Sequence, residues 1–203
     1  MPWYALTGAP GSGKTAILRQ LEQDGFMVVE EAATDVIALA HAIGEAEPWA
    51  IPGFTDRILA LQLRREQLAA AGNGLATVFF DRSPVCTLAL CHFLGQPVSP
   101  LLAAEVERAV AERRYGQAVF FVRGQGFVTP TAARRISLAD AAAFEKVHEE
   151  TYRELGFRLV EVAPGPLADR AGAVKRAALA LTRGLDPLAA PSMPGPAAHA
   201  VQD

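Results

Sequence analysis

Residues 8–15, GAPGSGKT, constrain this chain more than any other part of it. They match the pattern GxxxxGK[ST], whose glycines let the backbone curl until several N–H groups point at one phosphate-sized centre. A short apolar run precedes the segment and a helical pattern follows it. This context predicts a phosphate-binding loop, with Lys14 reaching the β- and γ-phosphates of ATP and Thr15 offering a hydroxyl to Mg²⁺. The residues expected to cradle the nucleotide are Gly8, Ala9, Pro10, Gly11, Ser12, Gly13, Lys14 and Thr15.

Short apolar runs alternate with longer helical patterns along the chain, which predicts an α/β fold. Strands are expected at residues 3–7, 26–30, 76–81, 117–123 and 157–162. Helices are expected at residues 14–23, 54–71, from Pro100 with Ser99 as its cap, from Ser137 to about residue 155, and at 166–183. Most strands are continuously apolar, as in a parallel sheet covered by helices on both faces. We therefore expect a three-layer P-loop NTPase sandwich at residues 1–184, followed by a Pro/Ala-rich, flexible tail at 185–203.

Composition excludes several other classes of protein. A net charge of −3 argues against a dedicated nucleic-acid binder, and no apolar run approaches the ~18 residues of a membrane helix. Cys86 and Cys91 lack CxxC spacing, which favours buried thiols in a reducing compartment. No signal peptide is visible, so we expect a cytoplasmic protein without membrane or nucleic-acid partners. The sequence does not indicate an oligomeric state.

Asp81 ends an apolar strand, which is the position of a Walker B aspartate that holds Mg²⁺ together with Thr15. A second interpretation is that Asp81 caps a helix beginning at Pro84. The next residue is Arg82, whereas motor ATPases of the AAA+ type usually carry a water-polarising glutamate at this position, which argues against such a motor. The one asparagine, Asn73, is followed by glycine, so the Asn-Lys-x-Asp motif of switch GTPases is absent. The absence of this motif does not exclude GTP as the phosphate donor in place of ATP.

Four arginines are candidates for neutralising a transferring phosphoryl group. Arg82 follows the Walker B position and Arg123 ends the fourth predicted strand. Arg134 and Arg135 follow a glycine-rich loop, where small P-loop kinases carry a mobile lid. A solvated turn before the next helix is the alternative for this arginine pair.

Acceptor-binding residues are expected at the second strand and around the long helix. Glu30 and Glu31 end that strand, and because successive strand residues point oppositely, one of them should face the site. We favour Glu31, as a carboxylate that could take a hydroxyl proton, over a helix-start charge. The candidates for an aromatic and polar acceptor pocket are Trp49, Phe54, Asp56, Arg57 and Gln62. Alternatively, these residues belong to the hydrophobic core and to the solvent-exposed face of the helix.

The segments GAPGSGKT, EAATDVI, FFDRSPVCTL, FFVRGQGF, PTAARRIS and HEETY together resemble a bacterial family of compact, AAA-like ATP-binding proteins. The chain is similar, over about residues 3–183, to the ribosylnicotinamide-kinase domain of NadR and to the nucleotide-binding domain of an animal TRP-channel translocation factor. The resemblance implies a sheet order of 2-3-1-4-5 and Mg²⁺-ATP. The resemblance does not settle the acceptor. Where NadR-like kinases are expected to carry an arginine shortly after the glutamate of the second strand, this chain has Ala33-Thr34-Asp35, which argues against nicotinamide riboside as the substrate.

Two functions fit these observations. The first is a Mg²⁺-dependent phosphotransferase that moves the γ-phosphoryl group of ATP to a small hydroxyl-bearing metabolite or nucleoside-like acceptor. The second is a regulatory or binding module with slow ATPase or GTPase activity. A cavity of acceptor size lined by Glu31, Trp49 and Arg57 would favour the first, and a closed apolar site there would favour the second.

Overall fold

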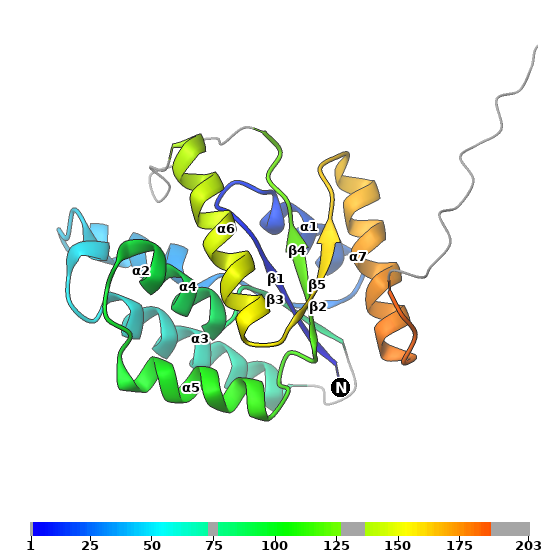
Figure 1. The fold of residues 1–203 in the computed structure, drawn as a ribbon, viewed down its shortest axis with the longest axis horizontal. Helices are drawn as coiled ribbons and strands as arrows, with labels where there is room; N and C mark the ends of the chain where they lie inside the picture. The colour runs from blue at the N-terminus through cyan, green and yellow to red at the C-terminus, as the bar shows by residue number, and fades with distance from the viewer. Residues whose placement is uncertain (1, 73–76, 127–136, 188–203) are drawn as a thin grey trace, which may run out of the picture.

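The computed structural model describes residues 2–72, 77–126 and 137–187, and places a five-stranded sheet between two layers of helices (Figure 1). The strands run in the order β2-β3-β1-β4-β5, and every neighbouring pair is parallel. This confirms the predicted α/β class and the predicted strand order. The strands are β1 (Trp3–Thr7), β2 (Met27–Val29), β3 (Val78–Asp81), β4 (Ala118–Val122) and β5 (Arg158–Val162).

Of the helices in the described residues, two cover one face of the sheet and four cover the other. α1 (Lys14–Gln23) and α7 (Leu167–Thr182) bury alanines, leucines and isoleucine against one face. The opposite face is covered by α3 (Phe54–Ala71), α4 (Pro84–Leu94), α5 (Pro100–Ala111) and α6 (Leu138–Glu154). A third, smaller apolar cluster joins α3 to α2 (Ala32–Ala42), beside the short 3₁₀ turn η1 (Pro48–Ala50). Figure 1 shows α1 and α7 on one side of the strands and the other helices on the opposite side.

Local signals predicted most of these elements. The first and third helices have the predicted limits, and the hydroxyl oxygens of Ser99 and Ser137 cap α5 and α6 as expected, accepting from backbone N–H groups at 3.1 and 3.0 Å. α2 was not predicted. It buries small and β-branched residues at a spacing of four, so its amphipathic pattern is weak. It also has no side-chain cap to mark its start.

The register brings the carboxyl ends of the strands to one edge of the sheet. Leu6 of β1 lies opposite Asp81 of β3, Thr7 lies opposite Phe121 of β4, and Val122 lies opposite Val162 of β5. The loops that leave these strand ends therefore open on the same side, as in other open parallel sheets that bind ligands there.

Gly8 makes the closest backbone approach of the loop that follows β1. Its φ is +127°, and a Cβ built on it would lie 2.3 Å from the carbonyl oxygen of Val122. That oxygen belongs to the backbone of β4, so it cannot swing away as a flexible side chain could. Only glycine therefore lets the phosphate-binding loop leave β1 directly beside the end of β4.

Gly8→Ala is expected to lower the free energy of unfolding by roughly 3 kcal/mol, because it adds a steric clash to a strained φ. Chemical denaturation measures this. Gly25→Ala is the matched control, since Gly25 has a φ of +91° but nothing within 4 Å of an added Cβ. It should cost about 1 kcal/mol through backbone strain alone. Equal losses in the two variants would show that the contact with β4 is unimportant.

Cys86 and Cys91 are both buried free thiols, as predicted. None of the helices in the described part of the chain combines the length and the hydropathy needed to cross a bilayer.

Candidate functional site

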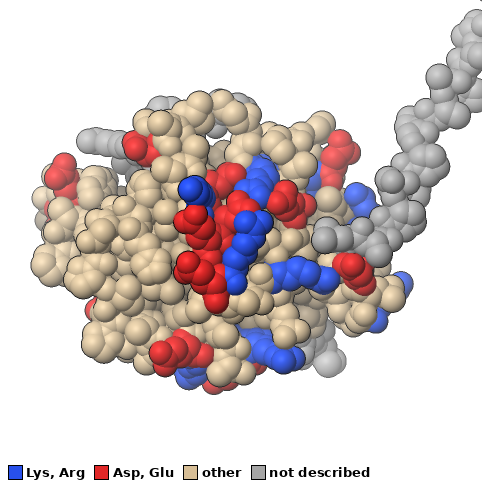
Figure 2. All heavy atoms as spheres, in the orientation of Figure 1, with Lys and Arg blue, Asp and Glu red and all other residues tan. Residues whose placement is uncertain are grey.

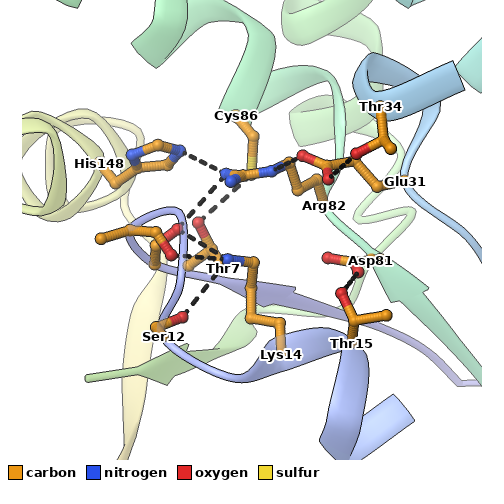
Figure 3. Close-up of polar contacts among 12 residues, drawn as sticks. Thr7, Ser12, Lys14, Thr15, Glu31, Thr34, Asp81, Arg82, Cys86 and His148 are labelled. Carbon is orange, nitrogen blue, oxygen red and sulfur yellow. Dashed lines mark hydrogen bonds and ion pairs between the residues drawn. The ribbon is translucent and has the colours of Figure 1, made fainter. Parts of the chain in front are cut away.

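The loop between β1 and α1 encloses the side chain of its own lysine. Gly8, Gly11 and Gly13 all have positive φ, and this curls the backbone around the start of α1. The Lys14 ammonium donates to the carbonyl oxygens of Gly8 and Ala9, at 3.0 and 2.9 Å (Figure 3). Burial and the nearby Arg82 charge lower the pKa of Lys14 to about 8. The loop therefore holds a cation at the helix N-terminus, where a polyphosphate would approach.

Thr15 and Asp81 lie together beside this lysine. The Thr15 hydroxyl donates to Oδ2 of Asp81 at 3.1 Å, and Asp81 Oδ1 is buried without a hydrogen-bond partner among the described residues. Burial, and then the charge of Glu31, raise the pKa of Asp81. Ser83, not Asp81, stands at the N-cap of α4, so Asp81 is free of the capping role.

This pair fits a Mg²⁺ ion. An aspartate oxygen that is buried and unsatisfied is a ready ligand for a hard cation, and a threonine hydroxyl can supply a second oxygen. No group of three or more His, Cys, Asp or Glu side chains arranged for a metal occurs in the described ranges. A Mg²⁺ ion held here would take one or two protein oxygens and complete its coordination with phosphate oxygens and water.

Arg82 lies at the centre of the site, in a strained backbone conformation. Its φ is +76°, which costs a non-glycine residue on the order of 1 kcal/mol or more. Its Nε pairs with Glu31, and its Nη1 donates to Nε2 of His148 at 3.0 Å and weakly to the Gly8 carbonyl at 3.4 Å (Figure 3). The guanidinium is thereby held between the loop, the start of α2 and α6.

Glu31 is the N-cap residue of α2, and its carboxylate points into the site, whereas Glu30 is exposed and pairs with Arg19. Burial opposes ionisation of Glu31. The charges of Arg82 and Lys14, with a hydrogen bond from Thr34 at 2.8 Å, outweigh it and hold the pKa at about 2. The carboxylate is therefore ionised throughout the neutral range and can accept a further hydrogen bond.

A cavity of about 580 Å³ opens between the phosphate-binding loop and the helices α2, α3, α4 and α6. Lys14, Thr15, Glu31 and Arg82 line its polar end. The other end is lined mainly by apolar and aromatic side chains, among them Ile37, Trp49, Phe54, Ile58, Leu90 and Phe144. The volume lies within the ~300–1,000 Å³ typical of small-molecule sites, and a few polar groups at one end would orient a ligand.

Three of the five predicted acceptor residues line this cavity, and two do not. Trp49, Phe54 and Gln62 lie on its wall. Asp56 instead accepts a hydrogen bond from the Ser99 hydroxyl at 2.5 Å, and Arg57 pairs with Glu45 at 2.6 Å. Helix periodicity accounts for the division, because Phe54, Ile58 and Gln62 recur at a spacing of four along the face of α3 that lines the cavity, whereas Asp56 lies on the far side of the helix and Arg57 on the flank away from Gln62.

Arg123 faces away from the cavity despite its position directly after β4. Its guanidinium pairs with Glu145, Glu149 and Glu161, at 3.3, 2.6 and 2.6 Å, and lies 4.4 Å from the ring centroid of Phe121. Figure 2 shows basic and acidic side chains interleaved in a band over α6 and β5. A guanidinium bound to three carboxylates is poorly placed to neutralise phosphate. Arg134 and Arg135 lie outside the described residues.

One known protein family matches most of the chain. A family model described as an AAA domain matches residues 3–170, from β1 to the start of α7. The chain belongs to this AAA domain family. It is accordingly a P-loop NTPase with a nucleotide-binding loop. No curated protein matches the chain in sequence.

Solved structures similar to this AAA domain include two of the deoxyadenosine kinase from M. mycoides. One, with dCMP products and a flexible dCDP bound, has a TM-score of 0.54 at 14% identity and covers 88% of this chain and 99% of that chain. The other, with dATP bound, has a TM-score of 0.55 at 15% identity and covers 86% and 97%. At this identity the likeness establishes a shared kinase-like P-loop fold.

Arg170 is a residue of the site that the sequence did not reveal. It is buried on α7 of the AAA domain, and its Nη2 donates to the Ser12 carbonyl at 2.7 Å and to the Arg123 carbonyl at 3.3 Å. A Cβ on Gly13 would lie 2.6 Å from its Nη1. Arg170 thus supports the phosphate-binding loop from behind. No local pattern distinguishes it from the other arginines, because the contact spans 158 residues of sequence.

Proposed function

We propose that this AAA domain transfers the γ-phosphoryl group of Mg²⁺-ATP to a hydroxyl of a small, ring-bearing acceptor of nucleoside-like shape. The observation that carries the proposal is the cavity that runs from Lys14 and Glu31 to an aromatic end around Trp49 and Phe54. A simple ATPase needs room only for water beside the phosphates. A cavity of about 580 Å³ with polar groups confined to one end suits an acceptor with a flat apolar body and one reactive hydroxyl.

The kinase proposal is favoured over a regulatory module by the state of that cavity. A module that only senses nucleotide would be expected to have a closed apolar core beside the loop. Here the space is open, and an ionised carboxylate and a guanidinium face it. The similar solved structures are of a deoxyadenosine kinase, which is consistent with a nucleoside-like acceptor.

Each residue of the site has a proposed role that follows from its position. Lys14 and the loop N–H groups would bind the β- and γ-phosphates, and Arg82 would stabilise charge on the transferring group. Thr15 and Asp81 would hold Mg²⁺, which supplies charge neutralisation on the phosphates. Glu31 would accept the hydrogen bond of the acceptor hydroxyl and orient its oxygen toward the phosphorus. With a pKa of about 2, Glu31 is a weak base, so orientation is its main contribution. As the new P–O bond forms, the bond between the γ-phosphorus and the ADP oxygen breaks, and the hydroxyl proton passes by way of Glu31 to solvent while ADP leaves.

A panel of nucleosides and other hydroxyl-bearing ring compounds, each incubated with the full chain and Mg²⁺-ATP, tests the proposal. We expect at least one compound to raise ADP release above basal hydrolysis and to appear as its phosphate ester by mass spectrometry. If no compound is phosphorylated and basal hydrolysis stays slow, the regulatory module becomes the better account.

Asp81→Asn is expected to weaken the dependence of turnover on Mg²⁺ more than the affinity for nucleotide. The backbone cradle keeps the phosphates in place, while an amide is a much poorer ligand for Mg²⁺ than a carboxylate. A Mg²⁺ titration of turnover should shift by about tenfold or more to higher concentration. Asp56→Asn is a control, since Asp56 lies outside the cavity. A titration of Asp81→Asn that overlays the wild type would remove Asp81 from the metal site.

The affinity for ADP is expected to fall as the pH rises above about 8, the pKa of Lys14 in the free protein. Bound polyphosphate favours the charged ammonium and so raises this pKa. Below pH 8 the lysine is protonated in both states and the affinity should be constant. Above it, binding must take up a proton. Calorimetry at pH 9 in buffers of different ionisation enthalpy measures this uptake, and Lys14→Ala should abolish it. Uptake that persists in Lys14→Ala would assign the titration to another group.

A further inference from the structure

His148 is a buried titratable residue that the proposed mechanism does not use. It lies on α6, is 0% exposed, and packs its ring against that of Phe144 with centroids 4.2 Å apart. It is 66 residues from Arg82 in sequence, yet its Nε2 lies 3.0 Å from the Nη1 of Arg82 (Figure 3). It therefore connects α6 directly to the centre of the site.

The two contacts of the ring determine its protonation state. Nδ1 lies 2.9 Å from the carbonyl oxygen of Phe144, which can only accept a hydrogen bond, so Nδ1 carries the proton. The Arg82 guanidinium can only donate, so Nε2 must present its lone pair. Together they require a neutral imidazole with hydrogen on Nδ1. Burial, and then the positive charge of Arg82, lower the pKa of His148 well below its usual value, which keeps this form at neutral pH.

The same contacts determine the direction of the guanidinium. Glu31 accepts from Nε of Arg82 and His148 accepts from Nη1, so the plane of the group is fixed from two sides. Among the described residues no acceptor contacts Nη2 of Arg82. An arginine held in this way keeps one donor group available for an incoming anion without paying rotamer entropy when the anion binds.

We propose that His148 is a positioning residue: as a neutral acceptor it holds Arg82 in the orientation that contacts the transferring phosphoryl group. The inference rests on the proposed function, because it assigns His148 to the arginine that is proposed to stabilise charge in that reaction. It differs from a packing role, which would need the shape of the ring but not its lone pair.

Long-range ¹H–¹⁵N NMR of the full chain tests the protonation state without any activity. We expect His148 to give the pattern of a neutral ring protonated at Nδ1 at pH 7, with its resonances assigned by their loss in His148→Gln. A ring protonated at Nε2, or at both nitrogens, would overturn the proposal whatever the enzyme does.

Kinetics of Mg²⁺-ATP turnover, measured as basal hydrolysis and as transfer to any acceptor found, test the positioning. His148→Leu fills a similar volume without an acceptor, whereas His148→Gln keeps an amide oxygen near the position of Nε2. We expect His148→Leu to lower kcat about tenfold or more with KM for ATP within about twofold, and His148→Gln to recover kcat to within about threefold of wild type.

A double-mutant cycle with Arg82→Ala separates positioning from packing. If His148 acts through Arg82, His148→Leu should have no further effect in the Arg82→Ala background. Additive losses, or equal losses in His148→Leu and His148→Gln that follow their melting temperatures, would overturn the proposal. Absence of phosphorylated acceptor in the wild type would instead count against the proposed function, while the NMR result and the hydrolysis cycle would still decide the role of His148.

Discussion

Replacing Lys14 with alanine is expected to lower the rate of phosphoryl transfer by about 10²–10³-fold. The ammonium lies inside the phosphate-binding loop, 5% exposed, and is held by the carbonyl oxygens of Gly8 and Ala9. It is therefore in place before nucleotide arrives. Its charge contributes most when negative charge shifts between the β- and γ-phosphates, and in a buried site that charge is weakly screened.

The measurement is kcat and kcat/KM for Mg²⁺-ATP, together with the dissociation constant for ADP. Lys146→Ala is a matched control, since Lys146 is one of only three lysines in the chain and is exposed on α6 beside Glu150. It should leave all three quantities unchanged. Wild-type turnover in Lys14→Ala would mean that the loop is structural and that phosphate is held elsewhere.

Replacing Glu31 with glutamine is expected to lower transfer to the acceptor by about 10²-fold or more, and to change basal ATP hydrolysis much less. The amide oxygen of the glutamine can still accept from Nε of Arg82, and the NH2 group that replaces Oε2 can donate to the Thr34 hydroxyl, so both contacts are kept in a similar shape without the carboxylate charge. What is lost is the negative charge facing the acceptor hydroxyl. Water, as the competing nucleophile, needs less orientation by that carboxylate and is present in excess.

Glu30→Gln is the matched control, because Glu30 is the adjacent carboxylate and points out of the site toward Arg19. Its transfer rate should equal that of the wild type. Equal losses of transfer and hydrolysis in Glu31→Gln would indicate that Glu31 acts by holding Arg82 and not by binding the acceptor. The ratio of the two rates thus separates the two roles of one side chain.

Much of the fold could be predicted from local patterns. Continuous apolar runs marked β3 and β4, and serine caps marked the starts of α5 and α6, because strand burial and helix capping are decided within a few residues. α2 was missed because its buried face consists of small residues that give little contrast with its exposed face. Helix periodicity would also have separated Gln62, which lines the cavity, from Arg57, which does not.

The positions of the arginine side chains could not be predicted from local sequence patterns. Arg82 and Arg123 both follow strands whose carboxyl ends meet at the same edge of the sheet, so the sequence predicts the same phosphate-binding role for both. In the folded chain Arg82 faces the phosphate-binding loop, whereas Arg123 is bound by carboxylates from α6 and β5. Which acceptors lie within reach of a long side chain depends on the helices packed beside it.

The sequence by itself determined the class of fold, the phosphate-binding loop and the Asp81 and Glu31 positions, since each depends on residue types at fixed spacing along one strand or turn. Only the tertiary structure placed Arg170 behind the loop and His148 against Arg82, and only it opened the cavity beside Trp49. These contacts join residues 66 and 158 positions apart. They exist because α6 and α7 pack on opposite faces of the sheet and each brings one polar side chain to the same edge, an outcome of layer packing that no local pattern records.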